Sequence, residues 1–194
     1  MTAESSTHSE VRQTVTSAVR AELALLDIHP ARPQEVAEAR RFAAALIGGT
    51  IVSPAGLQRV HEYSGAGLFL HRDEDELTGV LALVMLSAAG HDAIRHETFD
   101  ALDPDLAHVA AIGEDPAALY GWGIAATRKM AARRLVDGLS AIANGPVGHL
   151  PYYSRAATPQ GERLLIERIG FRPYPGSTTG LLQLAPHLGS RIAA

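Results

Sequence analysis

The stretch YGWGIAATRKMAARR, residues 120–134, joins a short apolar run to a basic segment with helical character. Gly121 and Gly123 punctuate the apolar run, which passes through Ala-Ala-Thr into the basic segment. The first N–H groups of a helix, its dipole and nearby Arg and Lys side chains together favour a phosphate. The pattern predicts a strand that ends at an anion-binding helix start. The competing interpretation is a strand followed by an ordinary amphipathic helix with a solvated basic face.

Composition places the chain among ordinary globular proteins. It has 194 residues, of which 46% are hydrophobic and 20% charged, which suits one domain with a real core. A net charge of −4 argues against the broad basic surface that nonspecific nucleic-acid binding needs. The absence of cysteine excludes disulfides, thiol catalysis and cysteine-based zinc sites.

The chain start and the longest apolar runs bear on its location. Residues 1–10 are polar and lack the basic and apolar regions of a signal peptide, so we interpret them as a tail. The apolar run at 80–86 is the length of a strand and far too short for a membrane span. We therefore expect a cytoplasmic protein with no membrane partner. None of the nine histidines forms an HExxH motif or a short His-x-His pair with nearby acids, and we expect no metal site.

Hydrophobic periodicity predicts alternating helices and strands. Between residues 11 and 28 the spacing fits a helix, but 22–28 fits a first strand equally well, and both remain open. Two runs flank the acidic turn at 72–76 and should form a hairpin, and residues 87–115 form a long, partly helical excursion. The remaining helices are expected at 33–47, 54–64, 127–144 and 159–169, and the strands at 66–71, 77–86, 117–125, 147–155, 171–174 and 180–184.

These elements predict a single α/β domain over 11–194 with a mixed central sheet flanked by helices. No internal repeat or linker divides it. The run LTGVLALVML at 77–86 is apolar at almost every position, so it should be covered on both faces.

The order of elements resembles the Gcn5-related N-acetyltransferase superfamily, whose members have the acyl-CoA N-acyltransferase fold. Two segments carry the likeness: GIAATRKMAARRLVDGL, in the place of that family's pyrophosphate-binding signature, and ATPQGERLLIERIGFRPY, which is similar to its last helix and Gly-Phe turn. The resemblance covers roughly residues 30–185.

The resemblance implies acetyl-CoA or another acyl-CoA as co-substrate, with pantetheine in a V-shaped cleft between the strands that end near Ala125 and Arg155. It places the pyrophosphate on the amides of residues 127–132, with Arg128 and Lys129 pairing its charge. A backbone N–H on the 121–125 strand would polarise the thioester carbonyl. The implied cofactor-binding residues are Ile124, Ala125, Ala126, Thr127, Arg128, Lys129, Met130, Ala131, Ala132 and Arg133.

The sequence departs from the family pattern at three positions. Aligning Arg128 with the signature puts Ala131 on its first glycine and Arg133 where glycine or alanine is expected. The tyrosine that many members use as general acid falls on Ile166, which cannot protonate a thiolate. Tyr152 or Tyr153 could substitute as the general acid. Strand alternation points only one of them into the cleft. Glu114 is the candidate general base, although a solvated acidic turn is the commoner role for such a residue.

Two functions follow from this reasoning. The first is an N-acyltransferase that moves an acyl group from acyl-CoA to a small-molecule or peptide amine. The second is a catalytically inactive binding or regulatory module of the same fold, which the departures at Ile166 and Arg133 favour. The sequence does not identify the acceptor. The apolar terminal strands would suit a homodimer.

Overall fold

The computed structural model describes residues 14–48 and 50–186, so the tail expected at 1–10 lies outside them. Its centre is a seven-stranded sheet in the order β1-β2-β3-β4-β5-β7-β6. All neighbouring strands are antiparallel except β4 and β5, which are parallel. The strands are β1 (Ile28–Pro30), β2 (Leu68–Asp73), β3 (Glu76–Leu86), β4 (Ala118–Ala126), β5 (Tyr152–Arg155), β6 (Arg172–Pro173) and β7 (Leu181–Leu184).

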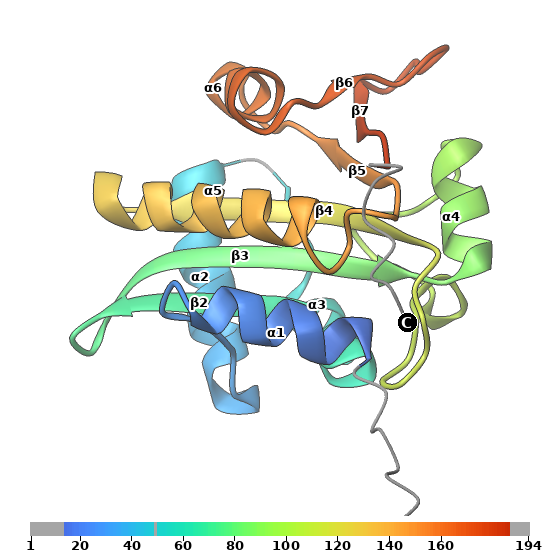
Figure 1. The fold of residues 1–194 in the computed structure, drawn as a ribbon. Coiled ribbons are helices and arrows are strands. Elements are labelled where there is room, and N and C mark those ends of the chain that lie inside the picture. Colours follow the sequence, from blue (N-terminus) through green and yellow to red (C-terminus); the bar gives the residue numbers. More distant parts are fainter. Residues whose placement is uncertain (1–13, 49, 187–194) are drawn as a thin grey trace, which may run out of the picture.

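Helices cover both faces of this sheet (Figure 1). On one face α1 packs against α5, and on the other α2 packs against α3, with α4 near the end of β3. A 3₁₀ turn at Pro33–Glu35 leads into α2, and α6 continues as a π-helix over Leu164–Ile169. The helices are α1 (Val15–Ala24), α2 (Val36–Ile47), α3 (Pro54–Ser64), α4 (Ala88–Arg95), α5 (Lys129–Asn144) and α6 (Pro159–Arg163).

The predicted fold class, a mixed sheet flanked by helices, is confirmed. The open choice at residues 11–28 is settled by a helix, α1, followed by the short strand β1. The excursion at 87–115 contains α4 and a 3₁₀ turn at Leu106–His108. The strand expected at 147–155 is shorter, because residues 145–149 form turns and β5 begins only at Tyr152.

Strand β3 is buried on both faces, as its continuous apolar sequence predicts. Leu81, Leu83 and Met85 join the core cluster beneath α1 and α5. Val80 and Val84 are buried on the other face, in clusters with residues of α2, α3 and α4. The hairpin with β2 turns at Glu74, whose φ of 57° is left-handed. The sheet therefore presents a rigid, two-sided platform to the elements that follow.

Candidate functional site

The parallel strands β4 and β5 separate after a short contact. They share three register pairs, of which Gly121 with Ser154 is the last. At that point the Ser154 hydroxyl donates a hydrogen bond to the Gly121 carbonyl, 3.1 Å away. β4 continues to Ala126, paired there only with β3, whereas β5 ends at Arg155. Over residues 122–126 the β4 backbone groups that point away from β3 therefore have no strand partner in the described chain.

A β-bulge lies in β4 where this separation starts. Ala82 pairs with Gly123 and Leu83 with Gly121, which leaves Trp122 as the extra residue. The Trp122 indole leaves the strand to donate a hydrogen bond to the Ala101 carbonyl, 2.6 Å away. The paired glycines of the sequence therefore mark a bulge, and bulges commonly occur next to functional sites.

Gly121 lies where the packing across the split is close. A Cβ at this position would lie 3.1 Å from the Ser154 hydroxyl oxygen and 3.3 Å from the Tyr152 ring and hydroxyl. At Gly123 a Cβ would meet only the Ile47 side chain, at 3.6 Å. A side chain at Gly121 would therefore press on β5 where the two strands are about to separate, whereas a side chain at Gly123 would have space beside it.

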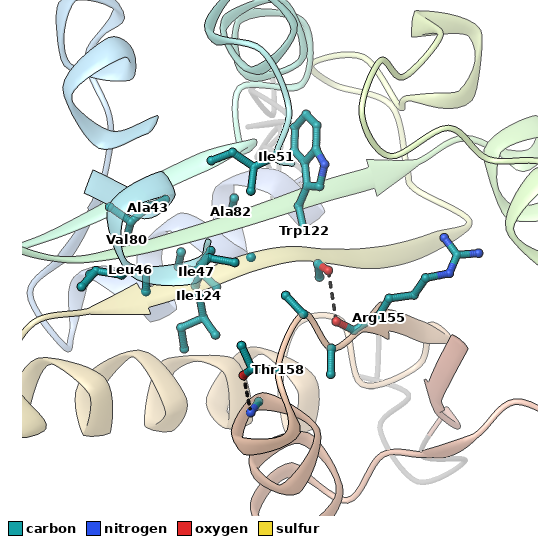
Figure 2. Close-up of a pocket in the computed structure, with 18 of the residues that line it drawn as sticks. Ala43, Leu46, Ile47, Ile51, Val80, Ala82, Trp122, Ile124, Arg155 and Thr158 are labelled. Carbon is teal, nitrogen blue, oxygen red and sulfur yellow. Dashed lines mark hydrogen bonds between the residues drawn. The ribbon is translucent and has the colours of Figure 1, made fainter. Parts of the chain in front are cut away.

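A cavity of about 680 Å³ occupies the split. It reaches from α5 and α6 on one face of the sheet to the end of α2 on the other (Figure 2). Its walls are largely aliphatic. The α5–α6 wall includes Ala132, Val136, Leu139, Gly161, Leu164 and Leu165; the α2 wall includes Ala43, Leu46, Ile47, Ile51, Leu102 and Trp122.

Among the described residues that line this cavity, the charged ones are Arg40 and Arg155, and no Asp, Glu or His is present. The Arg40 Nε donates to the Val52 carbonyl, 3.1 Å away, and so ties α2 to the segment after it. The Arg155 Nε donates to the Thr179 hydroxyl, 3.0 Å away. The cavity therefore offers positive charge and no carboxylate or imidazole base of its own.

Helix α5 begins beside the end of β4, as the opening stretch predicts. No side chain of the described chain caps its start, and its first internal hydrogen bond runs from the Ala132 amide to the Arg128 carbonyl, 3.0 Å. The amides of residues 129–131 are therefore without an assigned acceptor. Thr14, Ser53, Ser87 and Thr158, by contrast, cap α1, α3, α4 and α6 with their side chains.

Arg128 has two acidic partners in the structure. Its guanidinium pairs with Asp73 and Glu76, which flank the β2–β3 turn. All three side chains are about half exposed, and exposed pairs of this kind contribute only about 0–1 kcal/mol. An anion at the start of α5 would compete with these carboxylates for Arg128.

The predicted cofactor-binding residues divide into two groups. Ile124, Ala125, Ala126 and Ala132 line the cavity, whereas residues 127–131 and 133 do not. Among the latter, the Thr127 amide donates to the Thr78 carbonyl, Ala131 is buried, and Met130 is exposed. Arg133 lies on the exposed side of α5, 3.7 Å from Asp137. The role of these residues in binding stays a prediction.

The two candidate tyrosines point to opposite faces of the sheet, as strand alternation requires. Tyr152 lines the cavity and packs edge-on against Phe171, with ring centroids 5.2 Å apart. No hydrogen-bond partner is assigned to its hydroxyl within the described residues, and burial raises its pKa well above the usual value. The Tyr153 hydroxyl instead contacts His91 at 3.0 Å and accepts from Gln183 at 3.3 Å. Of the two candidates, Tyr152 is thus the one that lines the cavity.

Glu114 lies outside the cavity. Its carboxylate accepts a hydrogen bond from the Ala111 amide, 2.8 Å away, and so closes the turn before β4. The placement fits the solvated acidic turn better than a general base. Ile166 is 38% exposed on the π-helix and does not line the cavity, whereas its neighbours Leu164 and Leu165 do.

Several lining residues were not anticipated from the sequence. Arg40 and the end of α2 reach the cavity only through the tertiary fold, whereas the end of the strand at Arg155 was expected to border the cleft. Ser154 had one available signal, a polar residue beside two tyrosines in an otherwise apolar strand. No described helix combines the length and apolarity that a membrane crossing needs.

Neither a protein-family profile nor a curated protein matches the sequence. Solved structures with similar folds include "GphF GNAT-like decarboxylase in complex with isobutyryl-CoA", at 17% identity and a TM-score of 0.46, over 66% of this chain and 64% of that one. The chain thus spans less than two thirds of that protein. Another is an acetyltransferase, at 15% identity and a TM-score of 0.47, over 82% of this chain and 99% of the other.

Proposed function

We propose that the chain binds an acyl-CoA across the split between β4 and β5 and transfers its acyl group to an amine. The observation that carries the proposal is the free edge of β4 over residues 122–126, which borders a cavity of about 680 Å³. Pantetheine contains amide groups on a flexible apolar chain. The unpartnered β4 backbone can hydrogen-bond those amides, and the aliphatic walls can cover the chain between them.

The phosphates would lie at the start of α5. The uncapped amides of residues 129–131 and the helix dipole favour an anion there, and the basic side chains of Arg128 and Lys129 are close in sequence. Diphosphate would displace Asp73 and Glu76 from Arg128, which costs little because those pairs are exposed.

The transfer itself needs no covalent enzyme intermediate. The amine nitrogen attacks the thioester carbonyl carbon, the carbon–sulfur bond breaks, and the proton lost by nitrogen ends on the departing thiolate or on water. A β4 amide at the bulge would stabilise the developing oxyanion. Tyr152 lines the cavity, and the raised pKa of its hydroxyl keeps that group protonated, so it can donate a hydrogen bond to the departing thiolate. No carboxylate or histidine among the described lining residues can take a proton from an ammonium group. The amine would therefore have to lose that proton to water before it attacks.

The alternative is a binding module of the same fold. The lack of a lining base and the pairing of Arg128 with two carboxylates favour it. Both functions require acyl-CoA binding, so they differ only in turnover.

Calorimetry with acetyl-CoA, followed by a thiol-release assay over an amine panel, separates these outcomes. At a hundred times its dissociation constant a ligand should raise unfolding free energy by about 2.7 kcal/mol. Binding with amine-dependent thiol release supports the transferase. Binding without release on any amine supports the module, and no binding removes both.

A further inference from the structure

Arg155 is a charged residue of the cavity wall to which the proposed acyl transfer assigns no role. It is the last residue of β5, on the same face of the sheet as Tyr153 and opposite to Tyr152 and Ser154. Arg155 lines the cavity, and Figure 2 shows its side chain extending from the end of β5 away from Ile47 and Ile124. No carboxylate within the described residues forms a salt bridge with it, whereas seven of the fourteen described arginines have such a partner.

The Arg155 guanidinium is held in place by a second layer of contacts. Its Nε donates to the Thr179 hydroxyl, and that hydroxyl donates to the Glu97 carboxylate, 2.5 Å away. The same carboxylate accepts from the Ser177 hydroxyl and from the Thr178 amide and hydroxyl. These contacts lower the Glu97 pKa to about 2, so the carboxylate stays ionised. Thr179 is thereby fixed, and it uses only the Nε of Arg155.

Arg155 also interacts with the Tyr120 hydroxyl, whose pKa is raised by burial and lowered by the Arg155 guanidinium. A guanidinium carries five N–H donors, so the contacts to Thr179 and Tyr120 leave donors for a ligand. Trp122 and Leu102 also line the cavity. Arg40 lines the cavity from α2.

The positive charge of Arg40 and Arg155 in the cavity wall favours some classes of acceptor over others. A cationic acceptor with no anionic group would meet two arginines and no described carboxylate in the cavity wall. A carboxylate would find a planar guanidinium with free N–H donors, which is the geometry that arginine offers for paired hydrogen bonds. The apolar and aromatic surface of Leu102 and Trp122 can cover the rest of such a molecule.

We infer that the cavity takes an acceptor that carries a carboxylate beside its amine, as amino acids do, and that Arg155 binds this carboxylate while Thr179 and Glu97 position Arg155. The inference rests on the proposed acyl transfer for the identity of the site, but the binding of the anion can be measured without acyl transfer. The group recognised is the carboxylate, which a free amino acid or the C-terminus of a short peptide can supply.

The test compares amino acids with their own C-terminal amides, which lack the carboxylate, and rates are expressed per neutral amine because the amide also has a lower α-amino pKa. Wild-type protein should show a kcat/KM at least about tenfold higher for the acid of each accepted pair, since a charge-assisted hydrogen bond discriminates by about that much or more. Arg155→Met should remove the preference, mainly through KM, and Arg155→Lys should restore part of it. Thr179→Val should weaken the preference without abolishing it, because it removes only the contact to Nε.

Arg41→Met is the matched control, since Arg41 is an exposed arginine on α2 that does not line the cavity. It should leave the preference intact. Equal use of acid and amide by the wild-type protein, with acetyl-CoA still bound, would overturn this inference and leave the proposed function standing.

Calorimetry with the same pairs in the absence of acetyl-CoA supplies an independent readout. If acetyl-CoA does not bind, the proposed function fails, and the carboxylate site is then judged by this experiment alone. Tighter binding of the acids that is lost in Arg155→Met supports it. No difference between acid and amide, or a difference that survives in Arg155→Met, contradicts it.

Discussion

The hydroxyl of Ser154 donates a hydrogen bond to the carbonyl of Gly121 across the last register pair of β4 and β5. One residue later the strands have separated, and the cavity begins. The geometry of the site therefore depends on how closely the strands approach at this pair, and Gly121 permits that approach by having no side chain.

Replacement of Gly121 by alanine tests this dependence. A methyl group would press on Ser154 and on the Tyr152 ring, so Gly121→Ala should lower the unfolding free energy by about 1–3 kcal/mol. It should also weaken acetyl-CoA binding, because the strands would be forced apart. Gly123→Ala is the matched control, since its added methyl meets only Ile47 at an ordinary distance. Urea unfolding of both variants gives the comparison, and equal losses would refute a special role for Gly121.

The second prediction concerns the charge at the start of α5. If Arg128 pairs with the cofactor phosphates, Arg128→Ala should weaken acetyl-CoA binding by about 1.5–3 kcal/mol, the range for a hydrogen bond to a charged group. The double variant Asp73→Asn, Glu76→Gln should strengthen binding, because it frees Arg128 from its two carboxylates. Calorimetry at low salt measures both effects. Unchanged affinity in Arg128→Ala would move the phosphate site elsewhere.

The third prediction separates the two tyrosines. Tyr152→Phe should lower turnover at least about tenfold while acetyl-CoA still binds, because general acid assistance is typically worth more than that. Tyr153→Phe should leave turnover unchanged, since its hydroxyl contacts His91 and Gln183 on the other face of the sheet. Steady-state kinetics of both variants decides the matter. Full activity in Tyr152→Phe would show that the thiolate leaves without this hydroxyl.

The fourth prediction is a dependence of stability on pH. His61 is buried; its Nδ1 accepts from the Leu68 amide at 3.1 Å, and its Nε2 lies 2.8 Å from the Ala31 carbonyl, so the neutral ring fits both contacts. Burial lowers the pKa of His61. The neutral His61 ring therefore contributes fully to the free energy of unfolding above the unfolded-state pKa of about 6.5. This contribution is lost as the pH falls towards the lower pKa of the folded state.

Unfolding free energies measured between pH 8 and pH 5 should fall with acid by up to about 1.4 kcal/mol per pH unit for each such histidine. His71 and His91 also have lowered pKa values and should contribute in the same direction. His61→Gln should be less stable at pH 8 and should show a shallower fall below pH 6.5. An unchanged slope in this variant would contradict the role of His61.

The local pattern of the sequence predicted most elements because each depends on its neighbours in the chain. The proline and serine at 53–54 start α3, and the acidic run at 72–76 turns the β2–β3 hairpin, both by local chemistry. The bulge at Trp122, between Gly121 and Gly123, is visible only in the register of β3 and β4.

The candidate site was less predictable because its walls come from segments far apart in sequence. Arg40 and Arg155 are 115 positions apart by their numbers, and nothing local to either marks it as part of a cavity. The pairing of Arg128 with Asp73 and Glu76 is likewise a tertiary contact. Helical phase alone could not show that Ile166 is turned away while Leu164 and Leu165 face the cavity, because the π-helix changes the spacing there.

The three register pairs between β4 and β5 also have a mechanical consequence. Among the residues that the structure describes, they form the sole strand-to-strand junction between the larger half of the sheet, β1 to β4, and the smaller half made by β5, β7 and β6. Such a narrow junction is a natural axis for bending, and amides on either side of it should exchange with solvent in two separate groups. A molecule bound in the split would contact both halves of the sheet and restrict their relative movement. Its binding should therefore slow amide hydrogen exchange in β7 as well as in β4.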